Sequence, residues 1–245
     1  MSGLRDQAWV NRQSESRQDR RRRLTSRPAG RVPLPPPLQL CEPRGDAPRI
    51  YTMMPFSPVM NLGAAYNEAM ALLGPDDWVC FLDHDAIWTT RKWYGQLKEA
   101  ARALPDAGMI TAVQSRGWQV WQVGPQPESH DMQVHRKIGF EMAEERTLLD
   151  VTKSSGIAGV VMLISKRSWE IAGGFADGMY CVDHAMHFAL AAAGRPVYVH
   201  QGIYVYHWRR ANGDAPPADA PTAPNCPCSR IRREERPPTV RLNLP

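Results

Sequence analysis

The chain has 245 residues, of which 43% are hydrophobic, and it carries a formal net charge of +5. The length predicts one folded domain with flanking tails. Its five cysteines have neither the even count nor the spacing of a secreted disulfide framework, and no apolar run approaches the ~20 residues that a membrane-spanning helix needs.

The two ends of the chain differ in composition from the middle. Residues 1–48 are rich in Arg, Pro, Ser and Gln, and residues 211–245 are rich in Ala, Pro, Asp and Arg. Such segments bury too little apolar surface to fold alone, so we predict two disordered tails. The arginines of these tails are explained more simply as part of a solvated, disordered segment than as a nucleic-acid binding site. Contact of the tails with an anionic membrane surface is the remaining alternative. Because the N-terminus lacks the apolar region of a signal peptide, we expect a cytoplasmic protein that is at most peripheral to a membrane.

Between the tails, residues 49–210 alternate between short apolar runs and helical patterns. This alternation predicts an α/β domain with a mostly parallel central sheet flanked by helices. The apolar runs predict strands at 50–55, 78–82, 109–113, 157–164, 197–199 and 203–206. The helical patterns predict helices at 63–73, from Thr89 or Thr90 to Pro105, at 136–149, from Ser165 to Gly173, and at 183–193.

The acidic pair Asp83 and Asp85 directly follows the apolar run Trp78–Leu82. In an extended segment alternate side chains share a face, so both carboxylates can point the same way. Ligands of open α/β sheets bind beyond the carboxyl ends of strands, where two neighbouring carboxylates repel each other unless a cation lies between them. Oxygen ligands favour Mg²⁺ or Mn²⁺, which could neutralise a diphosphate leaving group. A solvated turn after a strand is the alternative interpretation.

A series of short motifs, in a fixed order, resembles the family-2 glycosyltransferases, and in particular a compact bacterial and phage-encoded branch. The first motif is the N-x-G-x-x-x-N pattern of Asn61, Gly63 and Asn67, which in that family lies on a helix before the strand with the D-x-D signature. Each motif is weak alone, and their order along residues 61–208 makes the resemblance specific. The later motifs are His130-Asp131 with 135–139, Ser155-Gly156, Gly173-Gly174-Phe175, Val182-Asp183 and 204–208.

The resemblance implies a glycosyltransferase-A, Rossmann-like fold and the transfer of a sugar from a nucleotide-sugar donor to a hydroxyl group, with inversion and with Mn²⁺ or Mg²⁺ as the cofactor. By position, Asp83 and Asp85 would bind the metal and the diphosphate, and His207 would be a further metal ligand. Asp183 would be the base that takes the proton of the acceptor hydroxyl. The acceptor, whether a glycan, a lipid-linked group or a protein, is not indicated. The other residues that the resemblance places at the donor are Asn61, Gly63, Asn67, His130, Gly173 and Gly174.

Several of these residues also have simpler interpretations. Asp183 precedes an apolar helix and could be its N-cap, and His207 could be a hydrogen-bonded strand histidine. The sequence also departs from the family, because only residues 49–60 of the predicted domain precede Asn61, which leaves recognition of the nucleotide base unassigned. Val182 stands where many relatives have glutamate. A non-catalytic nucleotide- or carbohydrate-binding module on the same scaffold is therefore the alternative function.

Overall fold

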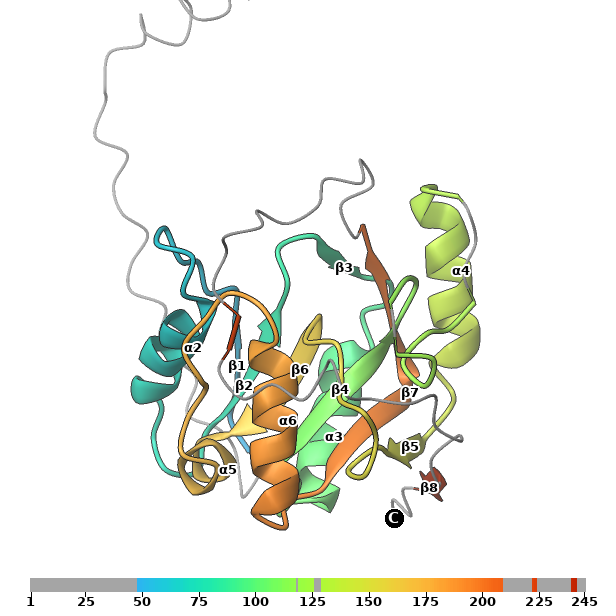
Figure 1. Ribbon diagram of the computed structural model, residues 1–245. Coiled ribbons are helices and arrows are strands. Elements are labelled where there is room, and N and C mark those ends of the chain that lie inside the picture. The colour runs from blue at the N-terminus through green and yellow to red at the C-terminus, as the bar shows by residue number, and fades with distance from the viewer. Residues whose placement is uncertain (1–47, 118, 126–128, 209–221, 224–238, 242–245) are drawn as a thin grey trace, which may run out of the picture. The chain divides into compact units, whose positions relative to one another are not determined.

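Among the residues that the structure describes, the strands form one eight-stranded sheet in the order β1-β2-β6-β4-β7-β5-β8, with β3 beside β7 (Figure 1). This is a computed structural model that describes residues 48–117, 119–125, 129–208, 222–223 and 239–241. The strands are β1 Ile50–Met53, β2 Trp78–Leu82, β3 Ala86–Trp88, β4 Met109–Gln114, β5 Thr147–Asp150, β6 Val161–Ser165, β7 Val197–His207 and β8 Thr239–Arg241.

The sheet is mixed, so the expectation of a mostly parallel sheet was wrong. Strand β1 is parallel to β2 and β4 is parallel to β7, but β6 runs antiparallel between β2 and β4, and β3, β5 and β8 are antiparallel to their neighbours. A buried strand appears in the sequence as a continuous apolar run whichever way it runs, so periodicity could not predict its direction. Because β6 opposes both β2 and β4, strands β1, β2, β4 and β7 share one direction. Their carboxyl ends therefore lie at the same edge of the sheet.

Helices cover both faces of the sheet, with α6 on one face and α3 on the other (Figure 1). Strand β2 shows how the two cores arise, because Val79 and Phe81 pack into the first cluster and Cys80 and Leu82 into the second. This is the alternation of side chains expected along a strand. The helices are α2 Leu62–Ala71, α3 Trp93–Ala103, α4 Met132–Met142, α5 Lys166–Ile171 and α6 Val182–Ala192.

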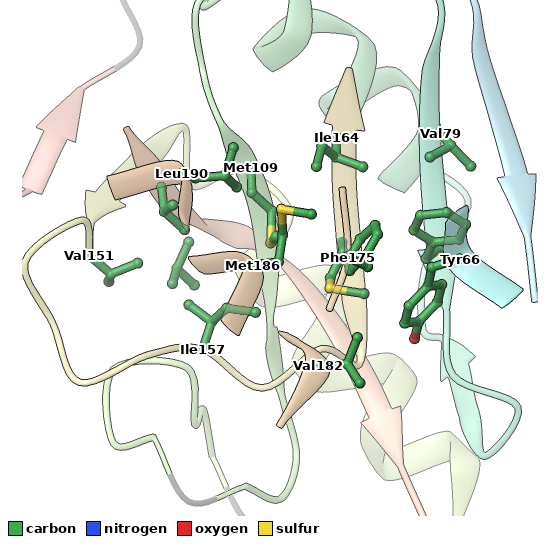
Figure 2. Close-up of a cluster of buried hydrophobic side chains, with 14 of the residues drawn as sticks. Tyr66, Val79, Met109, Val151, Ile157, Ile164, Phe175, Val182, Met186 and Leu190 are labelled. Atoms are coloured by element: carbon green, nitrogen blue, oxygen red, sulfur yellow. The ribbon is translucent and has the colours of Figure 1, made fainter. Parts of the chain in front are cut away.

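The first core cluster joins α2 and α6 to the sheet. Tyr66 of α2 packs on Phe175 with a ring separation of 4.8 Å, and Met186 and Leu190 form the buried stripe of α6 (Figure 2). Buried residues four positions apart lie on one face of a helix. The cluster fixes both helices against the face of the sheet on which Phe81 lies.

Some elements differ from the predictions for local reasons. The helix expected at 136–149 is α4 followed by β5, because the chain turns after Met142 and Thr147–Asp150 pairs with β7. The two strands expected at 197–199 and 203–206 are one strand, β7, with a register shift in its pairing to β4. Helix α3 has Lys92 as its N-cap, while the Thr89 hydroxyl instead donates to the Tyr204 carbonyl.

Residues 1–47 and most of 209–245, which hold the predicted disordered tails, lie outside the described residues. Two pieces of the C-terminal tail are described. Strand β8 pairs with β5, and Thr222 forms a bridge to Tyr180 beside the buried Ala223. Within the described part of the chain, every helix is too short or too polar to span a membrane.

Candidate metal centre

Asp83, Asp85 and His207 converge where β2 and β7 end. One ligand atom from each side chain lies within 4.8 Å of the others, and His207 Nε2 is 3.5 Å from Asp85 Oδ1. Two carboxylate oxygens and one imidazole nitrogen form a donor set that suits a divalent cation. The structure thus brings together the three residues that the sequence predicted as metal ligands.

Strand β3 explains why residues so far apart in sequence meet. It begins directly after the acidic pair and pairs with the end of β7, with Ala86 opposite His207. The Trp208 backbone N–H also donates to the Asp85 carbonyl at 2.9 Å. The register of this short strand therefore holds the acidic turn against the histidine.

The imidazole of His207 is oriented by its second nitrogen. Nδ1 lies 3.0 Å from Gln114 Oε1 and 3.1 Å from the Arg116 carbonyl oxygen. Because a carbonyl oxygen can only accept, Nδ1 carries a proton, and Nε2 is the nitrogen that faces the carboxylates. Metal-binding histidines commonly have such an acceptor behind them, since it fixes the tautomer and the ring orientation.

The two acidic side chains have opposite pKa shifts. Burial, followed by the charges of Asp85 and Asp183, raises the pKa of Asp83 to about 7, against the opposing effect of His207. The hydrogen bond with His207 lowers the pKa of Asp85. An ionised Asp83 is therefore disfavoured in the apo protein, and a bound cation would offset the repulsion.

Asp183 lies in the first turn of α6, near enough to Asp83 for its charge to help raise the pKa of Asp83. Its Oδ2 accepts the Gly159 N–H at 2.7 Å, and its Oδ1 accepts the His184 N–H at 2.9 Å. Gly159 belongs to the loop that enters β6 opposite the end of β2, and a Cβ at this position would lie 2.8 Å from the Cβ of Asp183. Asp183 is not the N-cap of α6, because that position is Cys181, with a left-handed φ of 59°.

Asn61 and Asn67 connect α2 to residues 173–178 through side-chain hydrogen bonds. Asn67 Oδ1 accepts from Trp169 Nε1 at 2.9 Å and from the Phe175 N–H at 2.8 Å, and its Nδ2 donates to the Phe175 carbonyl at 2.9 Å. Asn61 caps α2 and also accepts the Gly178 N–H at 3.0 Å. In this chain the two asparagines therefore hold together the segments that precede Asp183.

The glycines predicted at the donor lie in the same contact region between α2 and residues 173–178. A Cβ on Gly63 would lie 1.9 Å from the Ala176 carbonyl oxygen, so only glycine lets α2 approach this closely. Gly173 and Gly174 have φ values of 81° and 86°, which glycine adopts without strain. They allow the chain to turn after α5 toward Asn67.

His130 lies at the surface near the end of β7. Its Nδ1 is 2.6 Å from the hydroxyl of Tyr206, and its ring packs against Trp208. His135, from the same motif, is instead buried, between the Tyr204 hydroxyl at 3.0 Å and the Ser129 carbonyl at 3.0 Å. The structure thus brings His130, but not the side chain of His135, to the surface beside the metal centre.

Three residues of this region were not predicted from the sequence: Gln114, Arg116 and Gly159. Gln114 ends β4, and Arg116 follows it closely. Ligands of α/β sheets bind beyond the carboxyl ends of strands, so the argument that predicted the site after β2 could also have pointed to the end of β4. Arg116 has no ion-pair partner among the described residues, and its Nη1 is 3.4 Å from the Trp208 carbonyl. No sequence pattern singled out Gly159, whose role depends on a non-local contact.

No protein-family model matches this chain, and no curated protein is significantly similar to it. A fold by itself does not define an activity. Function therefore has to follow from the residues of the site and their chemistry.

Proposed function

We propose that the chain is a metal-dependent glycosyltransferase with a glycosyltransferase-A fold. It would move a sugar from a nucleotide-sugar donor to an acceptor hydroxyl by a single displacement, with inversion at the anomeric carbon. The observation that carries the proposal is the convergence of Asp83, Asp85 and His207 at the sheet edge, with Asp183 near enough for its charge to raise the pKa of Asp83. A cation site and a separate carboxylate nearby are the two elements that such a displacement needs.

Asp83, Asp85 and His207 would hold the cation. A nitrogen ligand beside two carboxylates suits Mn²⁺ better than an oxygen-only site would, while Mg²⁺ remains compatible with the carboxylates. When bound, the ion supplies positive charge that neutralises the diphosphate of the donor. Arg116 adds a further positive charge at the end of β4.

Asp183 would act on the acceptor. Each of its oxygens accepts one backbone N–H and keeps a further lone pair. The carboxylate is therefore oriented by the backbone and can still accept a proton. As the acceptor oxygen attacks the anomeric carbon, its proton moves to Asp183, and the bond from that carbon to the diphosphate breaks with the electron pair leaving on the diphosphate. The backbone hydrogen bonds fix the base for this transfer.

A non-catalytic binding module is the second candidate. The observation that favours it is the same pair of hydrogen bonds, because a carboxylate that only holds α6 against the loop before β6 would make them too. Such a module would bind nucleotide or sugar without turnover, and Asp183→Asn would leave its binding intact.

The test is release of nucleotide from a panel of nucleotide sugars, with Mn²⁺, with Mg²⁺ and with a chelator. We expect release only with metal, its loss in Asp85→Ala, and a fall of about 10²–10⁴-fold in Asp183→Asn. The matched control is Asp76→Ala, which removes an exposed carboxylate before the opposite end of β2. Metal-independent release that survives in Asp85→Ala contradicts the proposal, as does the absence of release from every donor by folded protein.

A further inference from the structure

We infer that the rings of Trp208 and His130 form a subsite for a pyranose ring at the rim of the metal centre. Trp208 follows His207 directly, and its backbone N–H donates to the Asp85 carbonyl at 2.9 Å. The backbone of Trp208 is therefore held next to the acidic turn. Even so, the residue is 44% exposed, which is unusual for the largest apolar side chain.

The exposed indole of Trp208 is supported by a second ring. The rings of His130 and Trp208 lie 4.7 Å apart at 37°, and Tyr206 meets the indole edge-on at 6.3 Å. Tyr206 is itself 2% exposed. A surface ring supported by a buried one presents a fixed face rather than a freely rotating side chain.

His130 adds a polar group beside this face. Its Nδ1 is engaged by the Tyr206 hydroxyl at 2.6 Å, and within the described part of the chain Nε2 has no hydrogen-bond partner. Whichever group donates in the bond to Tyr206, Nε2 is the nitrogen left for a ligand. The pair thus offers a flat apolar surface next to a hydrogen-bonding nitrogen.

A pyranose matches this combination. One face of the ring presents C–H groups, which pack on an aromatic ring, while its hydroxyls meet polar groups at the edge. The place of this subsite in catalysis depends on the proposed function, but its binding can be measured without it. The pyranose could be that of the acceptor or that of the donor, and the two are separable by competition.

The experiment is saturation-transfer NMR on the full chain in chelator, with the methyl β-glycosides of glucose, galactose and N-acetylglucosamine. We expect transfer to at least one glycoside and a loss of affinity of about tenfold in Trp208→Ala, equivalent to about 1.4 kcal/mol. Trp208→Phe keeps a ring and should retain most of the binding, whereas His130→Ala should weaken it. The matched control is Tyr94→Ala, which removes a ring of similar exposure, 41%, on α3.

The second readout is the indole N–H resonance of Trp208, which is identified because it disappears in Trp208→Phe. A bound glycoside should shift this resonance in the wild-type protein. The inference is overturned if folded wild-type protein binds none of the three glycosides, if Trp208→Ala binds them equally, or if nucleoside monophosphates shift this resonance and glycosides do not. With a nucleotide sugar and Mn²⁺ added, competition identifies a donor-sugar subsite, and simultaneous binding identifies an acceptor subsite. Metal-dependent nucleotide release without glycoside binding would refute the pyranose subsite and leave the proposed function standing. Glycoside binding without nucleotide release would refute the proposed function and leave the subsite standing.

Discussion

Replacing Asp83 with asparagine should make the metal-free protein more stable. Burial and the charges of Asp85 and Asp183 raise the pKa of Asp83 to about 7 in the fold, whereas the unfolded chain keeps the ordinary value of 3.8. The folded state thus binds this proton more tightly than the unfolded state does. Stability from this group is fully present below about pH 4 and is lost as the pH rises through about 7. Asparagine keeps the shape of the side chain and removes that loss.

The size of the effect follows from the interval between the two pKa values. About three pH units at about 1.36 kcal/mol each set a ceiling near 4 kcal/mol. Asp83 retains some contact with water, so its charge is screened, and we expect a gain of about 1–2 kcal/mol. For a domain of this size that corresponds to a rise of about 2–8 °C in the melting temperature.

The assay is thermal unfolding of wild type and Asp83→Asn in chelator between about pH 5 and pH 8, repeated with Mn²⁺. The variant should melt higher above pH 7, and its advantage should shrink toward pH 5. With Mn²⁺ the order should reverse, because a cation held by Asp83 stabilises only the wild type. The control is Asp76→Asn, which changes an exposed carboxylate. Equal melting at about pH 8 in chelator, or an advantage that grows toward low pH, would refute this account of the acidic cluster.

Three other substitutions test the supporting contacts. Gln114→Leu removes an acceptor behind His207 and should weaken Mn²⁺ binding about tenfold in an electron paramagnetic resonance titration; unchanged affinity would leave the Arg116 carbonyl as the sufficient partner. Gly159→Ala should displace Asp183 and lower nucleotide release about tenfold or more while Mn²⁺ still binds; full release would show that the loop adjusts. Asn67→Ala removes three hydrogen bonds and should lower the free energy of unfolding in urea by about 2–4 kcal/mol, and an unchanged midpoint would contradict a structural role.

Sequence patterns predicted the central elements but not their directions. The run Trp78–Leu82 is strand β2 as expected, and Ser165 caps α5 as expected, because both depend on neighbouring residues. The orientation of β6 depends on contacts with β2 and β4, which are distant in sequence. The three-residue strands β3 and β8 are too short to produce a periodic signal.

In the candidate site, too, residues next to a predicted strand could be identified from the sequence, whereas contacts between distant parts of the chain could not. Asp83 and Asp85 could be predicted because they follow a buried strand, and the structure places His207 beside them. The contacts that orient the site were not predictable, since Gly159 meets Asp183 only after the chain has folded. Asn61 and Asn67 were expected at the donor from the resemblance, and the structure gives them hydrogen bonds to residues 173–178. Whether they also contact a ligand stays a prediction.

The pairing of β3 with β7 has a consequence for local stability. The acidic turn and the histidine belong to distant parts of the chain, and a strand of three residues, Ala86–Trp88, keeps them in register. If that strand separates from β7, the ligand set comes apart although the rest of the sheet can remain intact. A captured cation would act as a cross-link at this point, so amide protons of β3 should exchange with solvent more slowly once metal is present.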